Sequence, residues 1–119
     1  MLELRHESTG PITVVTAEGD CDIYTSDLLR ALLAHLDDQG RHLIAVDLLG
    51  CTFLDAPGLA VIFAGLTRAR AGGGDLGVAC DSERVLKVFR TTGLAKRISI
   101  YPTLGELVTG LSEAAGDGL

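Results

Sequence analysis

The chain has little aromatic and little basic character. Its 119 residues include three Phe, two Tyr and no Trp, so aromatic residues make up 4% of the sequence. A hydrophobic core must therefore be built mainly from Leu, Val, Ile and Ala. Ten Lys and Arg stand against sixteen Asp and Glu, which gives a net charge of −6. Because nucleic-acid binding depends on Lys and Arg neutralising phosphates, we expect no direct contact with nucleic acid.

Leader-like segments, long apolar runs and paired cysteines are also missing from the sequence. Residues 1–6 form no apolar stretch of the kind that a signal peptide needs. The longest apolar runs fall far below the roughly 18 residues of a membrane span. Cys21, Cys51 and Cys80 are widely spaced and form no CxxC pair, a pattern that suits free thiols in a reducing compartment. We therefore expect a cytoplasmic protein without a membrane segment.

No motif of a familiar enzyme or cofactor site occurs. There is no Gly-x-Gly-x-x-Gly or Walker loop, and the glycines at 72–74 lack the following Lys-Ser/Thr that would reach a nucleotide phosphate. His6, His35 and His42 lie in separate segments, away from any Cys or acid at ligand spacing. No Gly-x-Ser-x-Gly elbow is present, and no Cys has an adjacent base. We expect no enzymatic activity, no cofactor and no metal site.

What is present is the composition of a globular protein, with 47% apolar and 22% charged residues. The length is typical of one domain. No linker, repeat or low-complexity segment interrupts the chain. We therefore predict a single domain over residues 1–119, with a core at about 3–112 and a frayed Gly-rich tail after Ala115.

Strand and helix signals alternate along the chain and indicate an α/β fold. Strands are predicted over residues 2–7, 12–19, 42–48, 76–80 and 98–101. Helices are predicted to begin at Thr25 or Ser26, at Asp55, at Ser82 and at Pro102-Thr103, and glycines at 40, 72–74 and 93 are predicted to end the first three. The order β-β-α-β-α-β-α-β-α implies a hairpin followed by a largely parallel sheet.

Three carboxylates stand where strands are predicted to end. Asp20 and Asp22 follow the second predicted strand, and Asp55 follows the third. If these strands are neighbours, Asp22 and Asp55 converge at the start of the helix over 56–70, which offers unpaired N–H groups and a partial positive charge. Helix capping by Asp55 and turn formation by Asp20 and Asp22 would explain the same residues without a functional role.

Charge is distributed unevenly along the chain. Residues 81–97 contain five cations against Asp81 and Glu83, a local balance of +3, whereas residues 1–55 contain three Arg against ten acids, a balance of −7. The cations are Arg84, Lys87, Arg90, Lys96 and Arg97. A solvated helix face accounts for this segment, and a phosphate- or acid-binding patch is the alternative.

Five short motifs together resemble a known family. They are Gly19-Asp20-Cys21-Asp22-Ile23, Val46-Asp47-Leu48, Phe53-Leu54-Asp55-x-x-Gly58-Leu59, Ser82-Glu83-Arg84-Val85 and Thr92-Gly93-Leu94. In this order and spacing they resemble STAS domains, and most of all the single-domain bacterial anti-sigma factor antagonists. The resemblance extends over residues 3 to 112, nearly the whole chain.

The resemblance implies a curved mixed sheet with helices packed mainly on one side. It also implies binding to an anti-sigma factor of the histidine-kinase ATPase type, so that a sigma factor is released. The implied partner-binding residues are Asp20, Asp22, Thr52, Asp55, Ala56, Pro57, Gly58 and Leu59. We expect a monomer or a weak homodimer.

The sequence departs from the family at the position of the phosphate acceptor. In typical members two Ser or Thr residues follow the Asp that corresponds to Asp55, and the hydroxyl next to the Gly is phosphorylated. Here Ala56 and Pro57 occupy these positions. Neither side chain has a hydroxyl, so the family's phosphoryl transfer cannot occur at this site.

Two consequences follow as alternatives. The domain could be an antagonist that binds its partner constitutively, or a scaffold or small-ligand or nucleotide sensor outside the sigma circuit. Thr52, Thr25 and Ser26 are candidate substitute acceptors, although loop and cap roles explain them as well. Cys21 and Cys51 flank the same strand ends and could supply redox control.

Overall fold

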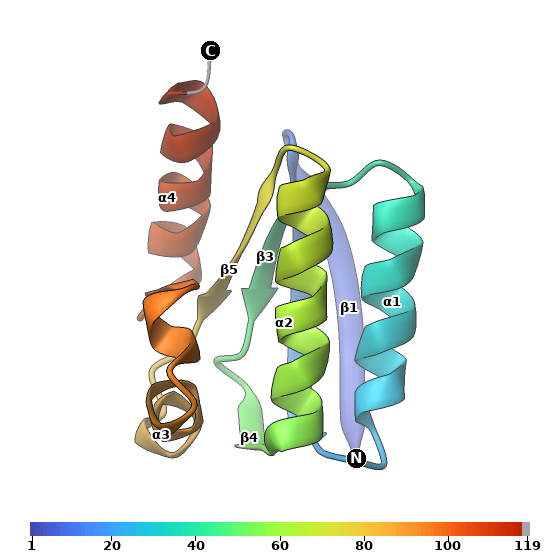
Figure 1. Ribbon diagram of the computed structural model, residues 1–119, viewed down its shortest axis with the longest axis vertical. Helices are drawn as coiled ribbons and strands as arrows, with labels where there is room; N and C mark the ends of the chain where they lie inside the picture. Colours follow the sequence, from blue (N-terminus) through green and yellow to red (C-terminus); the bar gives the residue numbers. More distant parts are fainter. Residues whose placement is uncertain (118–119) are drawn as a thin grey trace.

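One mixed sheet forms the centre of the molecule. The computed structural model describes residues 1–117 (Figure 1). Its strands are β1 (Leu2–Thr9), β2 (Ile12–Cys21), β3 (Leu43–Asp47), β4 (Cys51–Leu54), β5 (Asp75–Ala79) and β6 (Ser99–Tyr101). Its helices are α1 (Ser26–Asp38), α2 (Ala56–Ala71), α3 (Glu83–Thr91) and α4 (Leu104–Asp117), with a 3-10 turn η1 (Leu94–Lys96) after α3.

The sheet order is β1-β2-β3-β5-β6, with β4 attached to the far end of β2. β1 and β2 form an antiparallel hairpin, and all other pairs are parallel. β2 is long enough to pair twice. Its residues 13–16 pair with β3, and its residues 19–21 pair with β4 after a shift in register. The end of β2 and the end of β4 therefore lie side by side.

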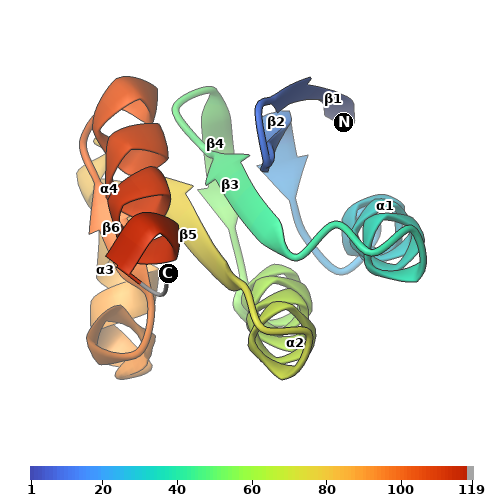
Figure 2. The same cartoon turned by 90° about the horizontal axis from the view of Figure 1, so that it is seen from above.

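Helices cover both faces of the sheet, with α1, α2 and α3 on one face and α4 on the other (Figure 2). The larger core lies under α1, α2 and α3, where Leu29, Ile62 and Phe89 are fully buried against Val15 and Leu76. A smaller cluster lies under α4 and consists of Ile12, Val14, Ala45, Ala79, Leu107 and Leu111. A largely parallel sheet needs such cover because both of its faces are apolar. The predicted α/β fold, with helices mainly on one side, is confirmed.

β4 is the one strand that the sequence did not predict. Its four residues are too few to show an apolar period, and only its end residues Cys51 and Leu54 are buried. The strand forms because the end of β2 supplies a hydrogen-bonding edge. Two placements change as a result: Asp20 lies inside β2 instead of after it, and Asp55 follows β4 instead of β3.

Glycines end the helices as the sequence predicted. Gly40 has a positive φ of 75° and follows α1, where the N–H of Arg41 donates to the carbonyl of Leu36 at 2.9 Å. This six-to-one bond is the mark of a Schellman motif, which needs a left-handed residue. Thr25 and Ser82 occupy the predicted N-cap positions, but neither hydroxyl caps its helix. The predicted frayed tail falls only in part on described residues, because α4 continues to Asp117 and residues 118–119 lie outside them.

Within residues 1–117, no helix combines the length and the apolar character needed to cross a membrane.

Leu107 tests the packing of α4 against the sheet. Its side chain is fully buried, so Leu107→Ala should leave a cavity and lower the free energy of unfolding by about 2–5 kcal/mol. The neighbouring Glu106 is exposed, and Glu106→Ala should change stability by no more than about 0.5 kcal/mol. Urea unfolding followed by circular dichroism measures both. Equal stability of the two variants would contradict the packing described for α4.

Candidate functional site

One carboxylate joins the start of α2 to the loop before α1. Asp55 is the N-cap of α2, and its Oδ1 accepts a hydrogen bond from the N–H of Gly58 at 3.0 Å. Its Oδ2 accepts from the N–H of Ile23 at 3.1 Å, 32 residues away in the chain. The N–H of Asp55 donates to the carbonyl of Cys21 at 3.3 Å. The predicted cap is confirmed, and Asp22 and Asp55 lie on neighbouring strand ends as expected.

The first turn of α2 rests directly on the end of β2. A Cβ at Gly58 would lie 2.6 Å from the carbonyl oxygen of Cys21 and 3.0 Å from its Sγ, so only glycine fits. Pro57, half-buried, occupies the first turn, where a missing N–H costs no hydrogen bond. Ala56 is exposed, whereas Gly58 and Leu59 are buried. Of the predicted partner-binding residues in this turn, only Ala56 and Pro57 reach the surface.

Asp22 organises the turn between β2 and α1. Its Oδ1 accepts hydrogen bonds from the N–H groups of Tyr24 at 2.9 Å and Thr25 at 3.0 Å, and from the Thr25 hydroxyl at 3.1 Å. Desolvation raises the pKa of the Asp22 carboxyl, but the hydrogen bonds from Tyr24 and Thr25 outweigh it, so the pKa lies below its usual value. The predicted turn-forming role is confirmed for Asp22, and the carboxylate is ionised near neutral pH.

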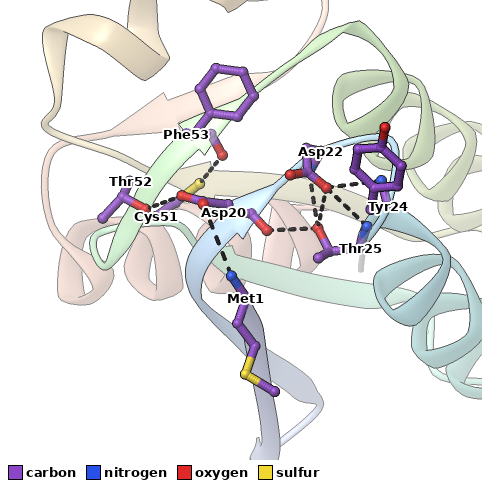
Figure 3. Close-up of polar contacts among 8 residues, drawn as sticks. All are labelled: Met1, Asp20, Asp22, Tyr24, Thr25, Cys51, Thr52 and Phe53. Atoms are coloured by element: carbon purple, nitrogen blue, oxygen red, sulfur yellow. Dashed lines mark hydrogen bonds and ion pairs between the residues drawn. The ribbon is translucent and has the colours of Figure 1, made fainter.

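Asp20 and Thr52 form a second polar cluster beside this turn (Figure 3). The Thr52 hydroxyl donates to Asp20 Oδ1 at 2.6 Å, and the ammonium group of Met1 lies 3.9 Å from Asp20 Oδ2. The Thr25 hydroxyl donates to the backbone carbonyl of Asp20 at 2.6 Å. These bonds hold the ends of β2 and β4 together. Thr52 and Asp20, 32 residues apart, are thus brought together as the predicted site requires.

Three exposed apolar side chains belong to the same segments as these acids, and the sequence analysis predicted none of them as a partner-binding residue. Tyr24 is 90% exposed, Ile23 63% and Phe53 41%. Tyr24 and Ile23 belong to the Asp22 turn, and Phe53 belongs to β4. Two sequence signals could have found them: Ile23 and Phe53 stand in the motifs that carry the family resemblance, and Tyr24 follows Ile23 in a polar turn. Large exposed apolar side chains that gather at one end of a molecule mark interaction sites.

We call this end of the molecule the strand-end surface. It consists of Asp20, Asp22, Ile23, Tyr24, Thr52, Phe53, Asp55, Ala56 and Pro57. It combines acidic groups with apolar side chains and is built where β2 and β4 end and α2 begins. In parallel sheets, functional groups gather at such strand ends.

The three cysteines lie under this surface and do not contribute to it. Cys21, Cys51 and Cys80 are buried and form no disulfide. Burial, together with smaller contributions from the neighbouring thiol of Cys51 and the carboxylates of Asp55 and Asp22, raises the pKa of Cys21 to about 12. Burial also raises the pKa values of Cys51 and Cys80. Thiols with raised pKa values are poor nucleophiles.

The candidate substitute acceptors differ in how accessible their hydroxyls are. Ser26 is buried, and the Thr25 hydroxyl is engaged by Asp20 and Asp22. Thr52 is exposed, but its hydroxyl is bound to Asp20. Among residues 1–117, no group of three or more His, Cys, Asp or Glu side chains is placed to hold a metal ion.

The sequence and the fold are those of a known family. The family model of the STAS domain matches residues 3–107, and the chain therefore belongs to the STAS domain family. Among curated proteins, it is similar to the anti-sigma-B factor antagonist of Bacillus subtilis strain 168. The two are 33% identical over 86 residues, which cover 72% of this chain and 78% of that protein.

Solved structures show the same fold at lower sequence identity. An anti-sigma factor antagonist from Mycobacterium paratuberculosis has a TM-score of 0.88 at 22% identity, covering 94% of this chain and 95% of that one. The antagonist SpoIIAA in its unphosphorylated form has a TM-score of 0.80 at 20% identity, covering 93% and 97%. Its phosphorylated form has a TM-score of 0.69 at 21% identity, covering 92% and 97%.

Asp55 should matter more for stability than an exposed carboxylate that accepts no such hydrogen bonds. Asp55→Ala removes acceptors for the N–H groups of Gly58 and Ile23, and we expect it to lower the free energy of unfolding by about 2 kcal/mol. Asp55→Asn keeps one carbonyl oxygen as an acceptor and should lower the free energy of unfolding by less. The exposed Asp38→Ala is the control. Urea unfolding measures the free energy of unfolding of each variant. If Asp55→Ala were as stable as Asp38→Ala, the stabilising role of the Asp55 hydrogen bonds would be disproved.

The buried thiols should be inert in the folded protein. At pH 8, a thiol with a pKa of about 12 is ionised in only about one molecule in 10,000, so Cys21 should react very slowly. Titration with Ellman's reagent should give little signal in buffer and three thiols per chain in guanidinium. Rapid labelling of the native protein would contradict this burial and would support redox control.

Proposed function

We propose that this chain is an anti-sigma factor antagonist. In this role it binds an anti-sigma factor of the ATPase or kinase type in the cytoplasm and thereby releases a sigma factor. The observation that carries the proposal is the 33% identity to an anti-sigma-B factor antagonist, spanning 78% of that protein. The chain therefore matches most of a protein named for this function, and not only a domain within a larger one.

The strand-end surface supports binding to a protein. Its carboxylates at Asp20 and Asp22 are fixed by hydrogen bonds, so they lose little freedom on binding. The exposed side chains of Ile23, Tyr24 and Phe53 supply apolar area beside them. Tyr is enriched at protein interfaces because it combines a large ring with a polar tip. This surface fits a partner that presents basic groups next to apolar ones.

Pro57 sets the regulation apart from that of a phosphorylated antagonist. Phosphorylation adds about −1.5 to −2 charge at neutral pH, which next to Asp55 and Asp22 would change the strand-end surface strongly. At position 57 there is no hydroxyl to accept a phosphate, and position 56 is Ala. We therefore propose that no phosphorylation at positions 56 and 57 ends the binding, so the kinase activity of the partner does not release the antagonist through this site.

A paired experiment tests binding and regulation. The wild-type chain and Pro57→Ser are each incubated with an anti-sigma factor kinase of the source genome and ATP, and complex formation and intact mass are followed. Wild type should bind, gain no phosphate and stay bound. Pro57→Ser should bind, gain one phosphate and dissociate. Addition of a phosphate to wild type would show that Thr52 or another hydroxyl is a substitute acceptor.

Exposed positions test the interface without disturbing the fold. Tyr24→Ala and Ile23→Lys should each weaken binding by about tenfold or more, because each removes an exposed apolar side chain and the Lys also adds a positive charge. Glu113→Lys on the exposed side of α4 is the matched control. Gly58 variants are unsuitable, since any Cβ there collides with Cys21. Full binding by both variants, or no binding by wild type, would overturn the proposed function.

A further inference from the structure

A groove runs along α2 on the side that faces α3 and η1. Its volume is about 540 Å³, and it is open to solvent. One wall is the apolar stripe Ala56, Leu59, Ala60 and Phe63 of α2. The spacing of these residues places them along one side of the helix. The opposite wall comes from the segment after α3, chiefly Gly93 and Leu94.

The groove contains one cation placed over an aromatic ring. The guanidinium carbon of Arg97 lies 6.0 Å from the centroid of the Phe63 ring, within the range of a cation–π contact. None of the ion pairs formed among residues 1–117 involves Arg97. Its backbone is anchored, because Arg70 donates a hydrogen bond to the Arg97 carbonyl at 2.8 Å. Within residues 1–117, the positive charge of Arg97 is thus paired with no carboxylate.

The electrostatic surroundings favour an acidic occupant. The segment 81–97, which forms α3 and the far wall, carries a balance of +3 in a chain whose net charge is −6. Part of this charge is neutralised within the segment, since Arg90 pairs with Glu83 at 2.8 Å. Arg97 lines the groove, and Lys96, its exposed neighbour in the chain, forms no ion pair among residues 1–117 either. A partner that presents a carboxylate here gains attraction, whereas a basic partner is repelled.

Ala56 connects the groove to the strand-end surface. This residue lines the groove and also forms the first turn of α2, next to Pro57. A protein seated on the strand-end surface can therefore continue along α2 without a break. Sites for small molecules usually bury most of their ligand, whereas this groove is open to solvent. A side chain that is part of a larger bound surface fits it better.

We propose that this groove receives an acidic amphipathic segment of the anti-sigma factor. An apolar side chain of that segment packs between Ala60, Phe63 and Leu94, and a carboxylate pairs with Arg97. The proposal rests on the proposed function. It adds a second contact of opposite sign: the partner meets acids at the strand-end surface and a cation in the groove. Two contacts of opposite charge fix the orientation of the partner, because a partner bound in the reversed orientation would place like charges against each other.

A charge reversal with a matched control tests the groove. Arg97→Glu and Arg84→Glu change charge equally within segment 81–97, but only Arg97 lines the groove. By calorimetry with the anti-sigma factor, Arg97→Glu should bind about tenfold more weakly, or worse, and Arg84→Glu within about twofold of wild type. Arg97→Ala should fall between wild type and Arg97→Glu. Circular dichroism confirms that each variant is folded.

A photo-crosslinking residue at position 60 identifies the occupant. It should label an apolar segment of the anti-sigma factor that contains Asp or Glu, and reversing that acid to Lys should restore binding to Arg97→Glu. Wild-type affinity in Arg97→Glu, with no crosslink at position 60, would overturn the groove proposal alone. Failure of the wild-type chain to bind the anti-sigma factor would overturn both the proposed function and the groove proposal. Movement of the Gly93 and Leu94 amide signals on adding nucleoside triphosphates or a fatty acid would instead assign the groove to a small ligand and overturn the proposal.

Discussion

The rest of the site depends on the two hydrogen bonds that Asp55 accepts. One oxygen caps α2 through Gly58, and the other holds the loop at Ile23. The same carboxylate thus sets where α2 begins and where the Asp22 turn lies. Its position follows from β4, because pairing of β4 with the end of β2 brings residues 32 positions apart into contact. Together with the hydrogen bond from Thr52 to Asp20, this bridge joins the two segments of the strand-end surface.

Proline and glycine at the start of α2 are compatible with this bridge for different reasons. Pro57 lies in the first turn, where its missing N–H leaves nothing unpaired. Gly58 lets the turn approach the carbonyl of Cys21, which no other residue allows. The chain therefore keeps the backbone of the site while lacking the hydroxyls at 56 and 57. The backbone of the site thus does not depend on a residue that can accept phosphate. For this reason we propose an antagonist that retains its binding surface but is not regulated by phosphorylation at position 57.

Much of this arrangement could be predicted from local signals. Asp55 before Ala-Pro-Gly marked a helix start, Gly40 marked a helix end, and the alternation of strands and helices indicated the α/β fold. β4 could not be predicted, because a four-residue strand forms only when β2 offers its edge. The groove was equally hidden: residues 56–63 and 92–97 carry no shared motif, and only the packing of η1 beside α2 brings Arg97 over Phe63.

The central claim is that this chain frees a sigma factor in a way that ATP does not reverse. Sigma-dependent transcription reconstituted with core polymerase, the anti-sigma factor kinase and this chain tests it directly. The account predicts that wild type restores transcription to the same level with and without prior incubation of the chain and the kinase with ATP, whereas Pro57→Ser restores it only without that incubation. No restoration by wild type, or its loss after incubation with ATP, would contradict the account.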